Sequence, residues 1–168
     1  LARPQSVSFH PVETAEQMYQ KVESLMDDDS VLICAAAVAD YSPKTSHRQK
    51  LSKKPQDLVL HLQPTRDILT LMGQHYPKSF RVGFAAQTHD LRTQSEKKWK
   101  RKNSQILVAN PVGPGLGFHS DHNQATVFYD TTRPPLVFPS MTKIRLAQKI
   151  LQLVASHKDL QPKTLSEK

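Results

Sequence analysis

One apolar run, which ends in small residues and is followed by an acid, limits the possible folds of this chain more than any other segment. Residues 31–37 read Val-Leu-Ile-Cys-Ala-Ala-Ala, and Asp40 and Tyr41 come shortly afterwards. Such a run is typical of a strand buried on both faces of a parallel sheet. Small residues at its end let a ligand approach the backbone, and Lys50, ten residues after Asp40, is able to reach a phosphate. We therefore expect a ligand site where this strand ends.

Apolar runs and helical patterns alternate along the rest of the chain. Thr14 and Gln17 form a capping-box signature, which predicts a helix that carries apolar residues as far as Met26. Further helices are expected to open at residues 64–67, to span 88–102, and to begin at a Ser140 cap with Ile144, Ala147, Ile150, Leu151 and Val154 on one face. Strands are predicted at 31–37, 58–62, 80–86, 106–109, 125–129 and 136–138, with loops at 41–56 and 111–123. This order predicts an α/β, Rossmann-like fold whose mainly parallel sheet is flanked by helices and ends in a late strand pair.

Composition fits a single domain with an anionic partner. The 168 residues suffice for one compact domain, which we place at 1–157, with a polar tail at 158–168. The net charge of +8 favours nucleotides, phosphorylated metabolites or nucleic acid. No apolar run reaches the length of about 18 residues that a membrane span needs. Cys34 is the single cysteine, and a reducing, cytoplasmic location fits this usage.

Asp40 and the lysines of the 41–56 loop are candidate nucleotide ligands, and each has a structural alternative. Asp40 either caps a turn or accepts a hydrogen bond from a sugar hydroxyl or base amine. Lys50, Lys53 and Lys54 form either a solvated basic loop or a flap. A flap lysine would close on a triphosphate and neutralise charge as pyrophosphate leaves.

Lys98 and Lys102 are four residues apart on a predicted helix and share one face. Like charges at that spacing destabilise a helix slightly unless an anion lies between them. A solvated face, a phosphate site and a nucleic-acid patch all stay open for this basic run. His119, Asp121 and His122 lie in a turn with loose spacing, so we predict no dedicated metal site.

Six ordered blocks resemble the synthetase domain of the bacterial coenzyme A biosynthesis flavoprotein, the CTP-dependent phosphopantothenate–cysteine ligase. One block reads Ala-Ala-Val-Ala-Asp-Tyr at the strand end, and another is a Lys-x-Lys-Lys-like loop. A third reads Val-Gly-Phe-Ala-Ala and is followed by Gln87. The blocks lie at 35–41, 50–54, 64–69, 82–88, 98–103 with 108–110, and 117–123. Their number and order make the resemblance specific, although each block alone is weak.

The resemblance implies a ligase of coenzyme A biosynthesis that joins 4′-phosphopantothenate to L-cysteine. The pantothenate carboxylate attacks the α-phosphate of CTP and releases pyrophosphate, and the cysteine amine then attacks the acyl-cytidylate and releases CMP. Mg²⁺ would accompany the nucleotide. The bacterial-type motifs favour CTP over the ATP used by eukaryotic relatives.

The resemblance also assigns site residues. The catalytic flap lysine would be Lys50, with Lys53 as the alternative. Lys98 and Lys102 would hold the triphosphate, and residues 66–69 with Phe84 would frame the base and ribose. The full nucleotide-binding set would be Cys34, Ala35, Ala36, Ala37, Asp40, Lys50, Arg66, Asp67, Ile68, Leu69, Phe84, Lys98 and Lys102.

Four features depart from the family pattern. Gln87 stands where the family has Glu, and Pro111 where it has Asp. The flap has one residue more between its lysines than the family pattern. The chain also starts after the family's glycine-rich segment, which carries the asparagine thought to handle the acyl-cytidylate. We therefore expect the nucleotide-binding half of a ligase, inactive alone, whose partners would be the missing segment, a decarboxylase domain or a second copy in a homodimer. The alternatives are a non-catalytic degenerate homologue and a basic nucleic-acid-binding module, the latter disfavoured because aromatics are scarce among the basic residues.

Overall fold

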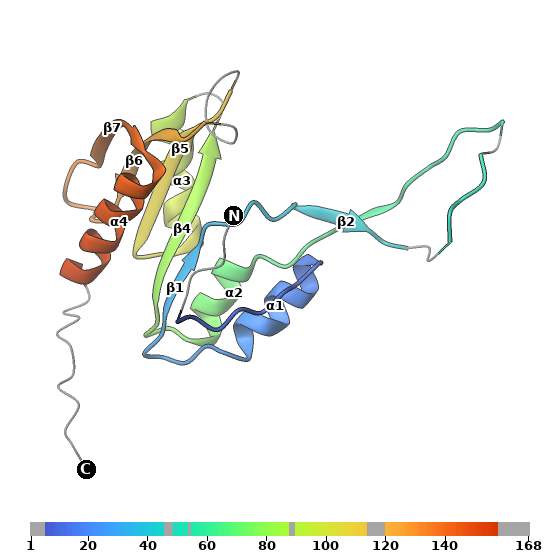
Figure 1. Ribbon diagram of the computed structural model, residues 1–168, viewed down its shortest axis with the longest axis horizontal. Coiled ribbons are helices and arrows are strands. Elements are labelled where there is room, and N and C mark those ends of the chain that lie inside the picture. The colour runs from blue at the N-terminus through green and yellow to red at the C-terminus, as the bar shows by residue number, and fades with distance from the viewer. Residues whose placement is uncertain (1–5, 46–48, 54, 88–89, 114–119, 158–168) are drawn as a thin grey trace, which may run out of the picture.

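The fold is a five-stranded mixed sheet with helices on both faces, seen in a computed structural model that describes residues 6–45, 49–53, 55–87, 90–113 and 120–157 (Figure 1). The strand order is β1–β4–β5–β6–β7. The first three of these strands, β1 (Val31–Cys34), β4 (Phe80–Gln87) and β5 (Ile106–Pro111), run parallel. The last two, β6 (His122–Phe128) and β7 (Leu136–Thr142), continue the sheet in antiparallel pairing. The predicted α/β fold, with a parallel centre and a late strand pair, is confirmed.

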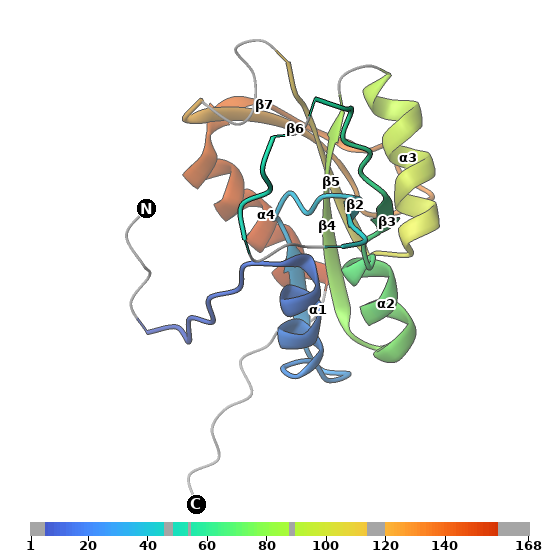
Figure 2. The same ribbon diagram turned by 90° about the vertical axis from the view of Figure 1, so that its right-hand side faces the viewer.

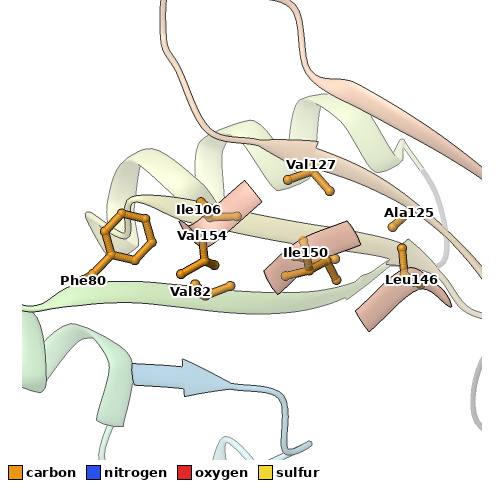
Figure 3. Packing of buried hydrophobic residues seen from close by; sticks show 9 residues of the cluster. Phe80, Val82, Ile106, Ala125, Val127, Leu146, Ile150 and Val154 are labelled. Carbon is orange, nitrogen blue, oxygen red and sulfur yellow. The ribbon is translucent and has the colours of Figure 1, made fainter. Parts of the chain in front are cut away.

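Side chains alternate along β5 between two helical layers. Ile106 and Val108 pack against α4 (Lys143–His157), in the cluster that Figure 3 shows. Leu107 and Ala109 point the other way and pack with Trp99 of α3 (Leu91–Lys102). The helices α1 (Ala15–Glu23) and α2 (Ile68–His75) lie on this second face, so α4 alone covers the first face among the described helices (Figure 2).

Local sequence sets the ends of the helices. The predicted capping box is confirmed, because the hydroxyl of Thr14 accepts from the backbone N–H of Gln17 while the Gln17 side chain accepts from the backbone N–H of Thr14. Asp67 caps α2 by accepting from the Thr70 N–H at 3.2 Å. Asn103 ends α3 in the left-handed conformation, with φ of 47°.

A two-stranded arm, to which residues 41–45, 49–53 and 55–64 belong, extends from the body of the molecule (Figure 1). Its strands β2 (Tyr41–Pro43) and β3 (Leu62–Pro64) pair with each other and not with the main sheet. The loop predicted at 41–56 therefore begins with a strand, and the strand predicted at 58–62 starts only at its last residue. The strand prediction assumed that the apolar run is buried. Leu58, Val59 and Leu60 are instead 70%, 71% and 63% exposed, so they do not pack into a core of the described chain.

The first strand is shorter and less buried than predicted. β1 ends at Cys34 instead of Ala37, and Val31 and Ile33 are 37% and 38% exposed. The reason is that β1 is the edge strand. Ile33 points to the face that α4 covers, but α4 packs on this face only from β4 onward, so Ile33 stays partly exposed. A run of apolar residues does not distinguish an edge strand from a central one.

The last helix begins later than predicted. Ser140 lies in β7, and the Thr142 hydroxyl accepts from the Arg145 N–H at 3.3 Å. The buried stripe consists of Leu146, Ile150 and Val154, which recur every four residues, whereas the predicted core residues Ile144 and Leu151 are 75% and 54% exposed and Ala147 is also exposed. No helix in the described part of the chain is long and apolar enough to cross a membrane.

Gly83 of β4 should tolerate no side chain. A Cβ at this position would lie 2.6 Å from Leu69 Cδ2 and 3.1 Å from Leu107 Cδ1. We expect Gly83→Ala to lower the free energy of unfolding by about 1–3 kcal/mol, as overpacked cores do. Urea denaturation measures this change. Gly113→Ala is the control, since no heavy atom of the described residues lies within 4 Å of its Cβ position. Equal stability of the two variants would show that the Gly83 site is not tightly packed.

Candidate functional site

A cavity of about 620 Å³ opens at the carboxyl ends of β1 and β4, between the sheet and the helices α2 and α3. Its walls come from the residues that follow β1, the start of α2, the end of α3, and Phe84 and Ala86 of β4. Ligands of open α/β sheets bind at this edge, outside the carboxyl ends of the strands. The cavity thus lies where the strand-end motif predicts a site.

The residues after β1 form an open rim. Residues 35–37 line the cavity and are exposed. Their methyl side chains are small, so they leave the mouth of the cavity open. Thr65 holds the next turn: its N–H donates to the carbonyl oxygen of Asp40 at 2.9 Å, and its hydroxyl donates to that of Ala39. The Asp40 side chain lines the cavity at the base of the arm. A fixed backbone therefore presents this carboxylate to the cavity.

Asp67 connects the start of α2 to the end of α3. Its Oδ1 caps the helix, and its Oδ2 lies 2.7 Å from Nζ of Lys102. Partial burial acts to raise the pKa of Asp67, but hydrogen bonds from Lys102 and Thr70 outweigh burial and hold the pKa below its usual 3.8. Asp67 is therefore ionised at neutral pH, and the link to Lys102 persists until the pH falls through this lowered pKa.

The basic run of α3 divides between two faces. Lys98 and Lys102 line the cavity, and the Lys102 side chain is only 19% exposed. Lys100 instead pairs with Glu96 at 2.8 Å, and Lys97 is exposed. The four-residue spacing thus concentrates two positive charges on the cavity wall, one turn apart. Such a pair can hold an anion with more than one charged oxygen.

Arg66 lines the cavity but turns its charge toward α1. Its Nε lies 3.0 Å from Oε2 of Glu16, and its guanidinium carbon lies 4.4 Å from the centre of the Tyr19 ring. These contacts join α1 to the segment that leads into α2. The role predicted for Arg66 toward a base or ribose stays a prediction.

The structure brings together all the predicted site residues except Lys50. The residues that line the cavity are Cys34, Ala35, Ala36, Ala37, Asp40, Arg66, Asp67, Ile68, Leu69, Phe84, Lys98 and Lys102. Lys50 is exposed in the arm and does not line it, and Lys53 is exposed there too, while Lys54 lies outside the described residues. The flap role of Lys50 is therefore still a prediction.

Several cavity residues escaped the sequence analysis. Thr65, Ala86 and Leu107 belong to the lining, and so does a mainly apolar extension formed by α1, β1 and residues beside them. That extension comprises His10, Val12, Met18, Lys21, Val22, Leu25, Leu32 and Ile33. Met18 and Val22 recur at helical spacing, which is equally typical of a core face, so the sequence held no signal that they would border a cavity.

Comparison with known proteins identifies the family. Residues 1–157 match the model of the DNA/pantothenate metabolism flavoprotein C-terminal domain. The chain belongs to this family. The structure superposes on the crystal structure of the C-terminal domain of the coenzyme A biosynthesis bifunctional protein CoaBC with a TM-score of 0.74 at 30% identity, covering 94% of this chain and 69% of that one.

Two relatives of the chain bear different names. The chain is 38% identical over 150 residues to the coenzyme A biosynthesis bifunctional protein CoaBC of Bacillus subtilis (strain 168), covering 88% of the chain and 36% of that protein. It is 33% identical over 157 residues to a cysteine/cysteine sulfinic acid decarboxylase of an unknown prokaryotic organism, covering 90% of the chain and 43% of that protein. The chain thus spans less than half the length of either relative, and its own reaction must be argued from the site.

The two substitutions that depart from the family motifs are neighbours. Gln87 and Pro111 are aligned partners at the ends of β4 and β5, and the N–H of Val112 donates to the carbonyl oxygen of Gln87 at 2.9 Å. Neither Gln87 nor Pro111 lines the cavity. Neither departure therefore falls in the described lining of the cavity.

Cys34 lies in the cavity wall beside the Asp67–Lys102 pair. Burial raises the pKa of its thiol from the usual 9.0 to about 11; the charge of Lys102 opposes this rise and that of Asp67 adds to it. Since the thiolate is the reactive form, this cysteine is a poor nucleophile at neutral pH.

Alkylation of Cys34 should therefore be slow at neutral pH. We expect the iodoacetamide rate to rise by about tenfold per pH unit, in step with the thiolate fraction, until the pH approaches about 11. Mass spectrometry of the folded chain measures the rate, and the urea-unfolded chain is the control with an ordinary thiol. A folded-state rate that levels off at the same pH as the unfolded control would show that burial does not govern this thiol.

Proposed function

We propose that this chain is the nucleotide-binding part of a CTP-dependent phosphopantothenate–cysteine ligase of coenzyme A biosynthesis. In this reaction the carboxylate of 4′-phosphopantothenate attacks the α-phosphorus of CTP, and the bond to pyrophosphate breaks. The amine of L-cysteine then attacks the acyl carbon, forms the amide and releases CMP. Membership in a family that contains CoaBC proteins supports the ligase assignment.

The observation that carries the proposal is the convergence of distant motifs on one cavity. The strand-end residues 34–40, the α2 start at 66–69 and the lysine pair of α3 are separated in sequence, yet all line it. A volume of about 620 Å³ falls in the range of small-molecule sites, about 300–1,000 Å³. Two lysines, a carboxylate rim and an aromatic wall are the groups that a nucleoside triphosphate needs.

Each wall has a chemical task in the proposed complex. Lys98 and Lys102 would neutralise phosphate oxygens and stabilise the charge that develops on the departing pyrophosphate. Asp40 would accept from a base amine or a sugar hydroxyl at the rim. The apolar side chains of Ile68, Leu69 and Phe84 would pack on the base and ribose.

Magnesium would enter with the nucleotide. Among the described residues, no group of three or more His, Cys, Asp and Glu side chains could hold a metal ion. Asp40 and Asp67 are the carboxylates of the described cavity lining, and Asp67 already contacts Lys102. Mg²⁺ commonly uses one or two carboxylates together with substrate phosphates and water, and this donor set fits that mode.

Further partners are part of the same proposal. The pantothenate and cysteine sites, together with a decarboxylase domain, would come from protein beyond this chain, since the chain covers 69% of the solved C-terminal domain and 36% of the Bacillus protein. The exposed apolar residues 58–60 of the arm support association into a homodimer.

Two other functions predict different behaviour. A degenerate, non-catalytic homologue would have lost the nucleotide site, but Gln87 and Pro111 lie outside the cavity wall. A nucleic-acid-binding module would use the whole basic run, whereas Lys98 and Lys102 face the cavity and Lys100 is paired with Glu96. Both observations favour the nucleotide site.

Calorimetric titration with CTP and with ATP, each with Mg²⁺, tests the proposal. We expect saturable binding that prefers CTP, and weakening by roughly 10- to 100-fold in Lys102→Met, because a hydrogen bond to a charged group contributes about 1.5–3 kcal/mol. Lys97→Met is the matched control, since Lys97 is exposed on the same helix and does not line the cavity. Absence of binding by the unmodified chain, or equal weakening by both variants, would refute the proposed nucleotide site.

Lys50 should act on the chemical step more than on binding. In a protein that contains the whole ligase domain, Lys50→Ala is expected to slow acyl-cytidylate formation by about 10²-fold or more while changing the CTP Kd by only a few fold, because a flap lysine acts mainly as charge develops. Single-turnover kinetics with labelled CTP measures both quantities. Lys53→Ala is the control, and a larger effect there would move the flap role to Lys53.

A further inference from the structure

Arg81 is a buried cation that pairs with no carboxylate among the described residues. It lies on β4 and is 2% exposed, and its side chain points to the face covered by α2 and α3. None of the ion pairs among the described residues involves it. A buried charge is tolerated only where strong hydrogen bonds replace water. The acceptors around Arg81 therefore show what it does in the fold.

Those acceptors include the C-cap carbonyl oxygens of two helices, together with Ser79. Nη1 donates to the carbonyl oxygen of Tyr76, the C-cap of α2, at 3.1 Å, and to Ser79 through its carbonyl at 2.7 Å and its hydroxyl at 2.9 Å. Nη2 donates to the carbonyl oxygen of Asn103, the C-cap of α3, at 3.1 Å. Helix carboxyl ends carry partial negative charge and attract a cation. A single side chain thus joins α2 to α3.

The end of α3 that Arg81 holds also carries the cavity lysines. Lys102 directly precedes Asn103, and Lys98 lies one turn earlier. Trp99 provides a second anchor for the same turn, because its Nε1 donates to the carbonyl oxygen of Ser104 at 2.6 Å. Arg81 therefore holds the peptide group that follows Asn103, one residue beyond Lys102.

Arg81 also fixes α2, whose first turn presents the partner of Lys102. The helix passes close over the guanidinium at Gly73, where a Cβ would lie 2.9 Å from Nε of Arg81. At the other end of α2, Asp67 contacts Nζ of Lys102 at 2.7 Å. Both members of the Asp67–Lys102 pair thus depend on helices that meet at Arg81.

We propose that Arg81 is a positioning residue for the phosphate site: by joining the carboxyl ends of α2 and α3, it sets where Lys102 lies relative to Asp67 and the cavity. Arg81 does not line the cavity, so it acts through Lys102 and not by contact with a ligand. The identity of the ligand rests on the proposed function, whereas the effect on the Asp67–Lys102 contact does not.

Titration of the Asp67 carboxyl group by ¹³C NMR tests the positioning directly. In Arg81→Lys and Arg81→Met, the pKa of Asp67 should rise toward its usual 3.8, because a displaced Lys102 no longer stabilises the ionised form. Lysine keeps the charge but has one ammonium group, which cannot reach both helix ends, so its effect should be the smaller one. An Asp67 pKa equal to that of the unmodified chain in both variants would overturn the proposal.

Nucleotide affinity supplies the second measurement. We expect the CTP Kd to rise about tenfold or more in Arg81→Met, while the CMP Kd changes less than about twofold. A displacement of the lysines by about an ångström would mainly weaken their contacts with the outer phosphates, which CMP lacks. Equal weakening of CTP and CMP would overturn the proposal. If the unmodified chain binds no CTP, the proposed function fails, while the Asp67 titration still decides the role of Arg81.

Two further variants separate positioning from loss of stability. Val154→Ala removes core contacts on the α4 face, so it should lower stability yet leave the Asp67 pKa and the CTP-to-CMP ratio unchanged. Gly73→Ala keeps Arg81 but pushes on its guanidinium, so it should shift both readouts in the same direction as Arg81→Lys, even if Arg81→Met does not fold. A Val154→Ala variant that moved both readouts equally would show that they report stability, against the proposal.

Discussion

The close approach of α2 to β4 is the constraint on which the site depends. Gly83 on the strand leaves space that Leu69 of α2 fills, with its Cδ2 at 2.6 Å from where a Cβ would be. Gly73 on the helix leaves space for the Arg81 guanidinium from the strand. Two glycines, one on each element, let α2 lie close to the sheet along its length. Asp67 is the N-cap of α2, so this close approach places its carboxylate at the cavity. There it lies within reach of Lys102, the last residue of α3.

Charge in the site is partly balanced before any anion arrives, because Lys102 already has a carboxylate partner. The two lysines one turn apart on α3 would repel each other, but Asp67 offsets one of them at 2.7 Å. The Thr70 N–H donates to the Asp67 carboxylate, and Arg81 donates to the carbonyl oxygen of Asn103, the residue after Lys102. The +8 charge of the whole chain says little about this site, since Lys100 and Arg133, for example, are paired with acids on the outer surface.

Local and periodic features of the fold were predictable from the sequence, and long-range placement was not. The capping box at Thr14 and the shared face of Lys98 and Lys102 follow from spacing of a few residues. The arm was missed because its apolar residues pack on nothing within the described chain. The buried stripe of α4 was predicted only in part: Ile150 and Val154 are buried, but the residues at 144 and 151 are apolar yet exposed, and only the neighbouring strands decide which stripe faces inward. Arg81 gave no signal at all, since a basic residue inside an apolar strand can be recognised as a helix anchor only when both helix ends are in place.

The Asp67–Lys102 contact gives the proposed nucleotide site a built-in competition. A triphosphate that binds Lys102 must share the lysine with Asp67 or displace it, and Lys102 at 19% exposure has little freedom to move elsewhere. Holding the ammonium group near its working position lowers the entropy lost on binding. The same contact opposes ligands that bring too little negative charge to compete with a carboxylate. The pair should therefore sharpen the preference for triphosphates over monophosphates, which is the selectivity that a nucleotide-activating ligase needs in order to bind its substrate and release CMP.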